Sequence, residues 1–388
     1  MRRLLLLVCA LVWVDTLLYS ALTPLLPHFE DTLNLSKAGV GVLVAAYAAG
    51  ALVGGLPGGA AAARLGPRRA VLIGVTLMGL ASLGFAFANG FWPLAGARFL
   101  QGVGSGFTWA GAFAWLLAAT PSSRRGEVIG TAMGAAVFGA LLGPVVGAAA
   151  ALLGRDVVFT ALAVLAVVFT VWTLQLDDSV PLEAPSLASM RRALRDNLFI
   201  GGLVLMALPS FLFGVLSTLA PLHLSAAGWG AAAIGAVWLV GAALETGISP
   251  VVGRVLDRRG VLLPVQLALT AAIPISIGLA IDLRPLVYVP LIVLAGGAYG
   301  ALFTPSFALI AEGAERSRLA QGMAFGLMNA AWAIGALVGP AAGGAVATAT
   351  GDVVPYLVSA GLCAIALAAV RRAQRRATAP ALQSDVAR

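Results

Sequence analysis

The sequence predicts an all-α membrane protein with twelve transmembrane helices in two pseudo-symmetric six-helix bundles. Its composition is the first reason: of 388 residues, 60% are hydrophobic and 10% are charged, with a mean hydropathy of +0.98. A soluble domain carries about 25% charged residues. The second reason is a series of twelve apolar stretches, and the third is a glycine–proline motif that occurs once in each half of the chain.

Each apolar stretch is long enough to cross a hydrocarbon core of about 30 Å, which takes about 20 helical residues. The stretches lack the alternation of apolar and polar residues that a membrane β-barrel requires. The first stretch is too long for the apolar region of a signal peptide, so we expect it in the mature chain. In order, the stretches cover residues 4–27, 38–63, 70–90, 92–119, 127–153, 156–176, 198–225, 229–253, 261–282, 286–311, 321–349 and 354–370.

The basic residues indicate how these spans are oriented. With the N-terminus inside, 20 of the 24 basic residues lie in cytoplasmic segments, and the exceptions are Lys37, Arg98, Arg155 and Arg284. The positive-inside rule then places both termini in the cytoplasm. The net charge of +8 therefore reflects topology, and we expect no nucleic-acid partner. Rich alanine and arginine usage with a single lysine is typical of a bacterium with a GC-rich genome, so we expect the plasma (inner) membrane.

A repeat divides the chain into two halves. "GALLGPVVGA" at 139–148 recurs as "GALVGPAAGG" at 335–344, and a polar segment lies between the halves. We therefore expect an N-terminal bundle over residues 1–176, a cytoplasmic linker over 177–197, a C-terminal bundle over 198–371 and a cytoplasmic tail over 372–388. Two parallel six-span halves with a binding site between them near the midplane are typical of one class of secondary transporter.

The glycines of the repeat recur every four residues, so they form one helix face that another helix can approach closely. The proline removes a backbone donor and bends the span. Tight packing alone is the alternative to a role in gating. The positions are Gly139, Gly143, Pro144 and Gly147 on the fifth span and Gly335, Gly339, Pro340 and Gly343 on the eleventh.

Four motifs carry a resemblance to a known family. They are "DTLLYSALTPLLP" at 15–27, "RFLQGVGSG" at 98–106, "GPVVGA" at 143–148 and the loop "GAAAARLGPRR" at 59–69. In these motifs the chain resembles the twelve-span drug:proton antiporters of the major facilitator superfamily, over about residues 4–371. The resemblance implies that an ion gradient drives transport through two halves that open alternately.

The loop motif departs from the family at Ala63, where the family has an acidic residue that latches the two halves. The resemblance therefore implies either a one-sided latch or one to which Glu127 contributes. The gating positions that match are Gly59, Arg64 and Gly66 in the first copy and Gly253, Asp257 and Arg258 in the second, "GRVLDRRG".

Several function classes are excluded. A pump driven by ATP needs a phosphate loop with a Gly-Lys-Ser/Thr sequence, but the single lysine, Lys37, follows "NLS" in a predicted outside loop. We therefore expect transport to draw on an ion gradient or to run passively, unless a separate ATPase subunit assists. Cys9 and Cys363 fall inside spans, where they act as small apolar residues. No Cys/His cluster is present, so we expect no metal site, no cofactor and no enzyme activity.

Three charged residues lie within the spans, where a charge is costly and usually faces a cavity or a partner. By helical rise, Asp15 lies about 16 Å and Glu245 about 14 Å from the cytoplasmic ends of their spans, near the midplane. We predict that Asp15 is the proton-coupling residue. Glu245 is the second candidate, or the ion-pair partner of an arginine. Arg98 is the predicted buried charge partner, unless it reaches the outer interface.

Helical spacing supplies neighbours for these charges. Arg98, Gln101, Ser105 and Thr108 form one polar stripe on the fourth span. Aromatic residues beside a buried carboxylate suit a lipophilic cation, although single aromatic residues in spans more often pack or anchor at the interface. The predicted substrate-binding residues are Tyr19, Gln101, Ser105, Trp238, Asn329 and Trp332.

Together these features predict a secondary active transporter, a proton-coupled exporter of drugs or other amphipathic, cationic organic molecules. Its expected partners are a small-molecule substrate, protons and the lipid bilayer, and we expect a monomer. One alternative is a proton-coupled transporter of a polar metabolite or sugar. Another is a non-transporting membrane protein on the same fold, against which the buried acids and the repeated glycines argue.

Overall fold

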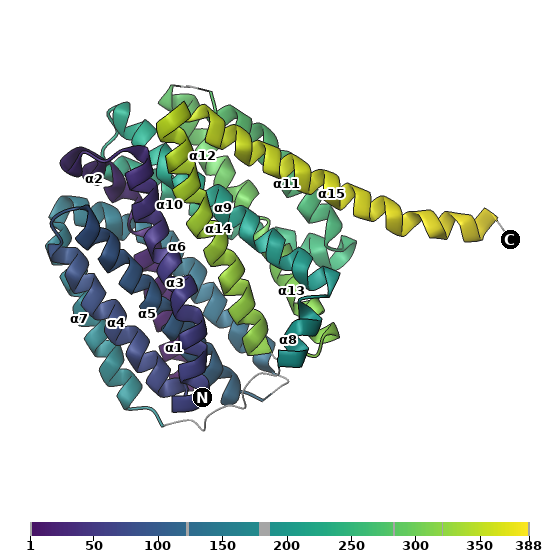
Figure 1. The fold of residues 1–388 in the computed structure, drawn as a ribbon, viewed down its shortest axis with the longest axis horizontal. Helices are drawn as coiled ribbons and strands as arrows, with labels where there is room; N and C mark the ends of the chain where they lie inside the picture. Colours follow the sequence, from purple (N-terminus) through teal and green to yellow (C-terminus); the bar gives the residue numbers. More distant parts are fainter. Residues whose placement is uncertain (1, 122–123, 178–186, 282–283, 320, 387–388) are drawn as a thin grey trace.

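Helices make up nearly all of the structure, a computed structural model that describes residues 2–121, 124–177, 187–281, 284–319 and 321–386 (Figure 1). The first half of the chain forms α1 (Arg2–Ser20), the 3₁₀ helix η1 (Thr23–Leu25), α2 (Leu26–Leu33), α3 (Lys37–Leu65), α4 (Pro67–Phe87), α5 (Phe91–Ala118), α6 (Arg125–Leu153) and α7 (Arg155–Leu174). The second half forms α8 (Leu187–Ala193), α9 (Asn197–Ala226), α10 (Ala231–Arg259), α11 (Leu262–Leu279), α12 (Pro285–Gly300), α13 (Phe303–Arg316), α14 (Gln321–Thr350) and α15 (Val353–Val386).

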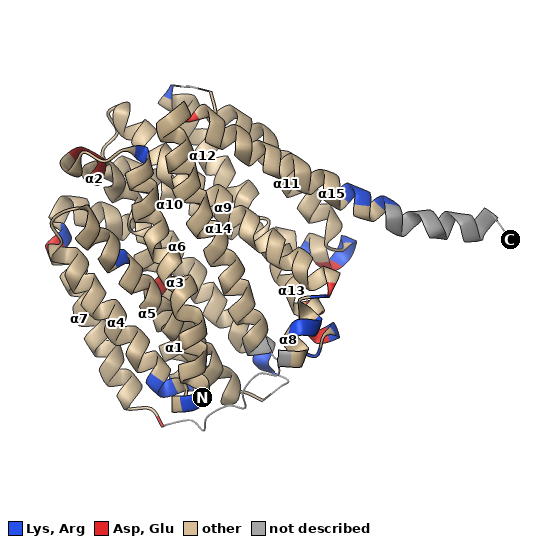
Figure 2. Ribbon diagram, viewed as in Figure 1, with Lys and Arg blue, Asp and Glu red and all other residues tan. Residues whose placement is uncertain are grey.

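The basic residues gather at one end of the bundle, near the N-terminus, and at the start of the extended part of α15 (Figure 2). We call this the arginine-rich end, defined by Arg2, Arg69, Arg125, Arg258 and Arg316. The opposite end, which we call the Lys37 end, carries Lys37, Asn89, Arg155, Arg284 and Asp352. The charge asymmetry expected from the sequence is therefore a property of the fold, because consecutive spans run in opposite directions.

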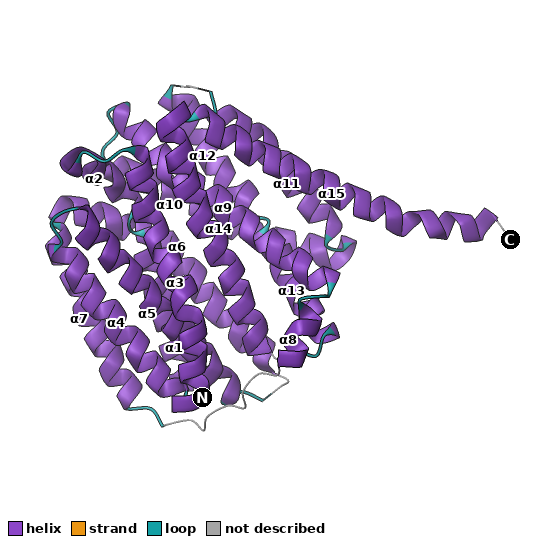
Figure 3. Ribbon diagram, viewed as in Figure 1, coloured by secondary structure: helices purple, strands orange, loops and turns teal. Residues whose placement is uncertain are grey.

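Eleven segments among the described residues are long and apolar enough to cross a membrane, two of which join α1 to α2 and α12 to α13. The remaining predicted span is α5, a 28-residue helix. It is less apolar because it carries Arg98, Gln101 and Ser105. With α5 counted, the predicted all-helical architecture of twelve spans is confirmed, and no strand occurs in the described ranges (Figure 3).

Short connections keep neighbouring spans antiparallel. Gly66 and Gly154 have φ angles of 95° and 101°, a region that favours glycine, and each turns the chain directly from one helix into the next. Pro67 occupies the first turn of α4, where its missing N–H costs nothing. Of the linker predicted over 177–197, residues 178–186 lie outside the described part of the chain. The rest of that linker contains α8.

Two apolar cores underlie the two halves. The first is built from α1 to α7, with Leu7 and Leu43 fully buried, and the second from α9 to α15, with Leu219 and Leu269 fully buried. A smaller cluster joins α8, α9, α13 and α14 at the arginine-rich end. Each half therefore has an apolar core of its own, built mainly from its own helices.

The halves meet along two helix pairs, α3 with α14 and α6 with α10. At Gly41 of α3, an added Cβ would collide with the carbonyl oxygen of Pro340 and lie 3.3 Å from the Cα of Gly344. At Gly235 of α10, it would lie 2.9 Å from the carbonyl oxygen of Pro144. Because these neighbours are backbone atoms, both helix pairs are packed as closely as glycine allows.

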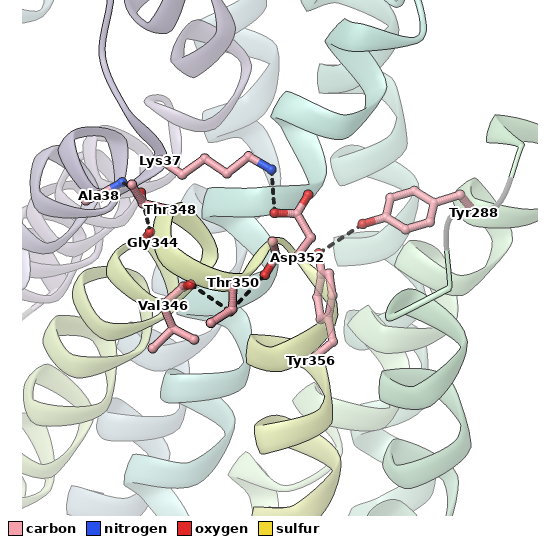
Figure 4. A network of polar contacts seen from close by, with 10 residues as sticks. Lys37, Ala38, Tyr288, Gly344, Val346, Thr348, Thr350, Asp352 and Tyr356 are labelled. Atoms are coloured by element: carbon pink, nitrogen blue, oxygen red, sulfur yellow. Dashed lines mark hydrogen bonds and ion pairs between the residues drawn. The ribbon is translucent and has the colours of Figure 1, made fainter.

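Polar contacts complete this closure at the Lys37 end (Figure 4). Lys37 Nζ lies 2.5 Å from Asp352 Oδ1. One residue further along α3, the N–H of Ala38 donates to Thr348 Oγ1 at 2.8 Å. We call the contacts of Lys37, Ala38 and Gly41 with Pro340, Gly344, Thr348 and Asp352 the outer seal, after the orientation expected from the sequence.

The same four helices are unopposed toward the arginine-rich end. A Cβ added there on any of them would have no described neighbour within 4 Å, at Gly59, Gly130, Gly253 or Gly326. Asp257 and Arg258 are exposed and form no ion pair with a described residue. Glu127 pairs at 3.0 Å with Arg124, the residue just before its own helix, so it does not latch the halves in this conformation.

Candidate functional site

Asp15 lies on α1 in the first core, and only 3% of its surface is exposed. Three side chains from two other helices donate hydrogen bonds to its carboxylate. Tyr47 Oη donates to Oδ1 at 2.8 Å, while Ser105 Oγ and Trp109 Nε1 donate to Oδ2 at 3.1 and 2.6 Å. Both carboxylate oxygens are therefore satisfied by neutral donors.

Arg98 is fully buried beside this carboxylate but does not form an ion pair with it. Its guanidinium donates to the backbone carbonyls of Leu18 and Tyr19 at 2.9 and 3.1 Å, and to Gln101 Oε1 at 2.9 Å. These carbonyls belong to the last turn of α1, where a helix has no backbone donors left to offer. Arg98 therefore stabilises the end of α1, just before η1 continues the first span.

Tyr47 connects the two buried charges. Its hydroxyl donates to Asp15, and its ring lies 4.7 Å from the Arg98 guanidinium carbon. Such a contact between a cation and an aromatic face is attractive. Gln101, which accepts from Arg98, donates in turn to Ser82 Oγ at 3.1 Å. The result is one continuous polar network across α1, α3, α4 and α5.

Two chains of aromatic rings lead from Asp15 to α14 in the other half. In the first chain, the ring centre of Tyr19 lies 5.3 Å from that of Tyr47 and 5.1 Å from that of Trp332. In the second chain, Trp109 stacks on Phe113 with the ring centres 5.3 Å apart, and Phe113 stacks on Phe325 with the ring centres 5.6 Å apart.

Both chains end on one face of α14, because Phe325 and Trp332 are seven residues, or two helical turns, apart. Asn329 lies one turn after Phe325, between the two ends, and is half-buried. Side chains that hydrogen-bond to Asp15 are thus linked to side chains that cross between the halves.

Glu245 and Trp238 lie on α10, in the second core, and do not join the Asp15 network. Glu245 is half-buried and forms no side-chain hydrogen bond or ion pair with any residue that the structure describes. The alternative that Glu245 pairs with an arginine therefore does not hold in this conformation. The described residues contain no cluster of three His, Cys, Asp or Glu side chains that could hold a metal ion.

The repeated glycines and the prolines beside them contact different halves of the protein. Gly139 and Gly143 pack against the backbone of α1, and Gly335 and Gly339 against the backbone of α9, so all four make contacts within their own half. The carbonyls of Pro144 and Pro340 instead face Gly235 and Gly41 of the other half. Each Gly-Pro pair therefore packs its helix within one half and presents it to the other.

Sequence reasoning missed three members of the site, Tyr47, Trp109 and Ser82. Trp109 could have been found, because it follows Ser105 by four residues on the polar stripe of α5. Thr108, assigned to that stripe, instead points to Met78 on α4, with Oγ1 3.6 Å from the sulfur. Tyr47 had no such signal, since its partner Asp15 is 32 residues away in the chain.

Comparison with known sequences identifies relatives among transporters. The chain is 31% identical over 155 residues to a Danio rerio protein named "Probable vesicular acetylcholine transporter-B", covering 38% of this chain and 31% of that protein. It is 28% identical over 124 residues to the quinolone resistance protein NorA of Staphylococcus aureus (strain MRSA252), with 32% of each chain covered. It is 29% identical over 153 residues to the hexuronate transporter of Bacillus subtilis (strain 168), covering 39% and 36%. The matches thus span about a third of each relative.

Solved structures match over nearly the whole chain. A bacterial homolog of the human lysosomal transporter Spinster superposes with a TM-score of 0.76 at 15% identity, covering 96% of each chain. A D-xylose-proton symporter superposes with a TM-score of 0.72 at 17% identity, covering 94% of this chain and 95% of that one. The Major Facilitator Superfamily profile matches residues 8–325. The chain therefore belongs to the major facilitator superfamily, a family of secondary transporters and not of enzymes.

Proposed function

We propose that this transporter is a proton-coupled exporter of amphipathic organic cations, with its arginine-rich end in the cytoplasm of a bacterial cell. The observation that carries the proposal is the buried Asp15 carboxylate, whose hydrogen-bond donors begin the two aromatic chains to α14. A charge at this depth is costly and marks an ion pathway more often than a structural contact.

The donor set suggests how a proton would act. All three side chains donate to Asp15, which suits an ionised carboxylate. The indole N–H of Trp109 can only donate, so a proton on Oδ2 would face a second hydrogen there. Protonation of Asp15 would therefore weaken the hydrogen bond that orients Trp109, and with it the stack of Trp109, Phe113 and Phe325.

Weakening that stack would favour separation of α5 from α14, and this links proton binding to the positions of the two halves. In the conformation described here, the outer seal is closed and the glycines toward the arginine-rich end are unopposed. We assign this conformation to the state that faces the cytoplasm. Alternation with the opposite state would require Lys37 to separate from Asp352, and the unopposed glycines to come together.

The proposed substrate class follows from the aromatic side chains around the acid. Aromatic rings with a carboxylate nearby recognise quaternary ammonium and other lipophilic cations. Acetylcholine, in the name of the Danio rerio relative, is such a cation, and quinolones, in the name of the Staphylococcus aureus relative, are amphipathic aromatic molecules. These names support an organic cation as substrate.

A second candidate is a proton-coupled transporter of a sugar acid, because one relative is named a hexuronate transporter. Gln101 and Asn329 are the amide side chains that would suit hydroxyl groups. The first proposal is favoured since Gln101 is fully buried and already bonded to Arg98 and Ser82, whereas the rings of Tyr19 and Trp332 are half-buried.

The test uses purified full-length protein in sealed lipid vesicles with an imposed pH gradient. Accumulation of ethidium, an organic cation, is measured beside accumulation of glucuronate, a hexuronate, with a pH-sensitive dye inside the vesicles. We expect ethidium to move against protons, and Asp15→Asn to abolish this accumulation because it leaves the site permanently neutral. The matched control is Asp31→Asn, which removes an exposed carboxylate of α2.

A folded Asp15→Asn protein that still concentrates ethidium as the unmodified protein does would show that Asp15 is not the coupling residue. Gradient-driven movement of glucuronate without ethidium would favour the second candidate. Folding of each variant is checked by thermal unfolding, because a collapsed bundle would lose transport for a trivial reason.

A further inference from the structure

A second carboxylate lies within the spans, in a setting opposite to that of Asp15. Asp15 is 3% exposed and accepts three hydrogen bonds. Glu245 is half-buried, and its carboxylate has no partner among the described residues. In this conformation Glu245 is therefore the intramembrane acid with free acceptor oxygens.

The fold gives the Glu245 side chain its space at a helix break. The side chain packs against Gly300, the last residue of α12, just before the chain turns into α13 at Phe303. A Cβ on Gly300 would lie 2.8 Å from Glu245 Oε1 and closer still to Cγ and Cδ of the same side chain. The absence of a side chain at Gly300 thus allows the carboxylate to lie between α10 and α12.

Aromatic residues lie close in sequence to Glu245 and to Gly300. Trp238 precedes Glu245 by seven residues, so the two share one face of α10. Phe303, one turn after Gly300, stacks parallel to Phe213 of α9 at 6.2 Å, and Phe213 meets the edge of Tyr299 at 5.7 Å. Trp238, Phe213 and Phe303 are half-buried, so parts of their surfaces are free to contact a ligand.

An ionised carboxylate without a partner is costly inside a bilayer, and a bound cation offsets that cost. We propose that Glu245 binds the positively charged group of an organic-cation substrate, at a subsite separate from Asp15. This inference rests on the proposed export of organic cations. Asp15 fits the proton-handling role better, because a cation could reach its oxygens only by displacing Tyr47, Ser105 or Trp109.

The two carboxylates would then divide the work between the halves. Asp15 in the first half holds the proton, and Glu245 in the second half selects a positively charged substrate. Neutralising Glu245 would therefore leave the binding affinity of an uncharged amphipathic molecule unchanged. It would lower the affinity of a cation, because the cation would lose its counter-charge.

The experiment measures equilibrium binding of tetraphenylphosphonium, a lipophilic cation, to the full-length protein in lipid nanodiscs, with uncharged chloramphenicol as a second probe. We expect Glu245→Gln to weaken tetraphenylphosphonium binding by about tenfold or more, the loss typical of a desolvated cation contact, and to leave chloramphenicol binding within about twofold. Glu245→Asp keeps the charge and should recover most of the affinity. Glu312→Gln, which removes an exposed acid of α13 paired with Arg316, is the matched control.

Equal tetraphenylphosphonium affinity of Glu245→Gln and the unmodified protein would overturn the proposal, and so would a parallel loss of both probes or no binding of tetraphenylphosphonium by the unmodified protein. Any of these results leaves the proton-coupled mechanism to its own test in vesicles. Chloramphenicol is added to that test as an uncharged substrate whose movement reports on Asp15 independently of Glu245. If Glu245→Gln unfolds, Glu245→Met, which also removes the charge, decides instead. Unchanged tetraphenylphosphonium affinity in a folded Glu245→Met protein would overturn the proposal.

Discussion

Gly41 offers the sharpest test of the outer seal, because its substitution by alanine adds a single methyl group at a known place. In the closed arrangement that methyl would collide with the carbonyl oxygen of Pro340 and lie 3.3 Å from the Cα of Gly344. Neither atom can move aside by rotating a side chain, since both belong to the backbone of α14. The helices α3 and α14 must therefore separate at the Lys37 end.

The expected magnitude follows from the cost of overpacking a close contact, typically about 1–3 kcal/mol. If that cost applies only to the state with the outer seal closed, the equilibrium between the two states shifts by about 5- to 150-fold toward the open seal. Alanine also favours the helix over glycine by about 1 kcal/mol. A control for this effect is Gly59→Ala on the same helix, which gives the same gain in helix propensity. Its methyl group is added where no described atom lies within 4 Å in this conformation.

The assay places spin labels at Thr32 of α2 and Ala349 of α14, which are exposed residues of different halves at the Lys37 end. The labels are attached to cysteines in a variant lacking Cys9 and Cys363. We expect Gly41→Ala to move the distance distribution toward longer values. Gly59→Ala should not do so, because a methyl group there obstructs only the opposite state, in which the unopposed glycines come together. An unchanged distribution in Gly41→Ala, or an equal shift in both variants, would refute the proposed role of the seal.

Three further results are expected. Lys37→Met removes the Lys37–Asp352 ion pair, whose side chains are 32% and 26% exposed, and should shift the equilibrium toward the open seal by about 0.5–1 kcal/mol, seen as slightly longer label distances. The swap of Lys37→Asp with Asp352→Lys should restore the original distances. Failure of the swap would mean that the ion pair does not hold the seal. Arg98→Met should destabilise the fold by about 1–3 kcal/mol, seen as a lower melting temperature, because it leaves the buried carbonyls of Leu18 and Tyr19 without their donor. A normal melting temperature would contradict this. Trp109→Phe keeps the stack on Phe113 but removes a hydrogen-bond donor to Asp15 worth about 1.5–3 kcal/mol. Proton-driven ethidium uptake should therefore fall while the protein stays folded. Undiminished uptake would show that Trp109 has no part in proton coupling.

Most of the architecture could be predicted from the sequence, because each prediction used a property that is local or compositional. The length and hydropathy of a span depend on its own residues, and its orientation depends on arginines close to its ends. The repeated "GPVVGA" and "GPAAGG" segments indicated two related halves without any knowledge of how those halves pack. Asp15 and Glu245 could be singled out for the same reason, since an acid within an apolar stretch is visible in one dimension.

The contacts of each acid depend on how the helices pack against one another. Tyr47 reaches Asp15 from another helix, and whether a tyrosine faces the core or the lipid depends on the rotation of its helix. Trp109 replaced Thr108 on the site-facing side of α5 because a helix places residues three and four apart on one face, and spacing alone does not choose between them.

The pairing of Gly41 with Pro340 and of Gly235 with Pro144 likewise required knowing which helices meet. The twelve spans, the two halves and the two intramembrane acids could be predicted from the chain alone, because they follow from short-range patterns. The contrast between a fully hydrogen-bonded Asp15 and an unpartnered Glu245 arises from packing between helices far apart in the chain, and no short-range pattern records it.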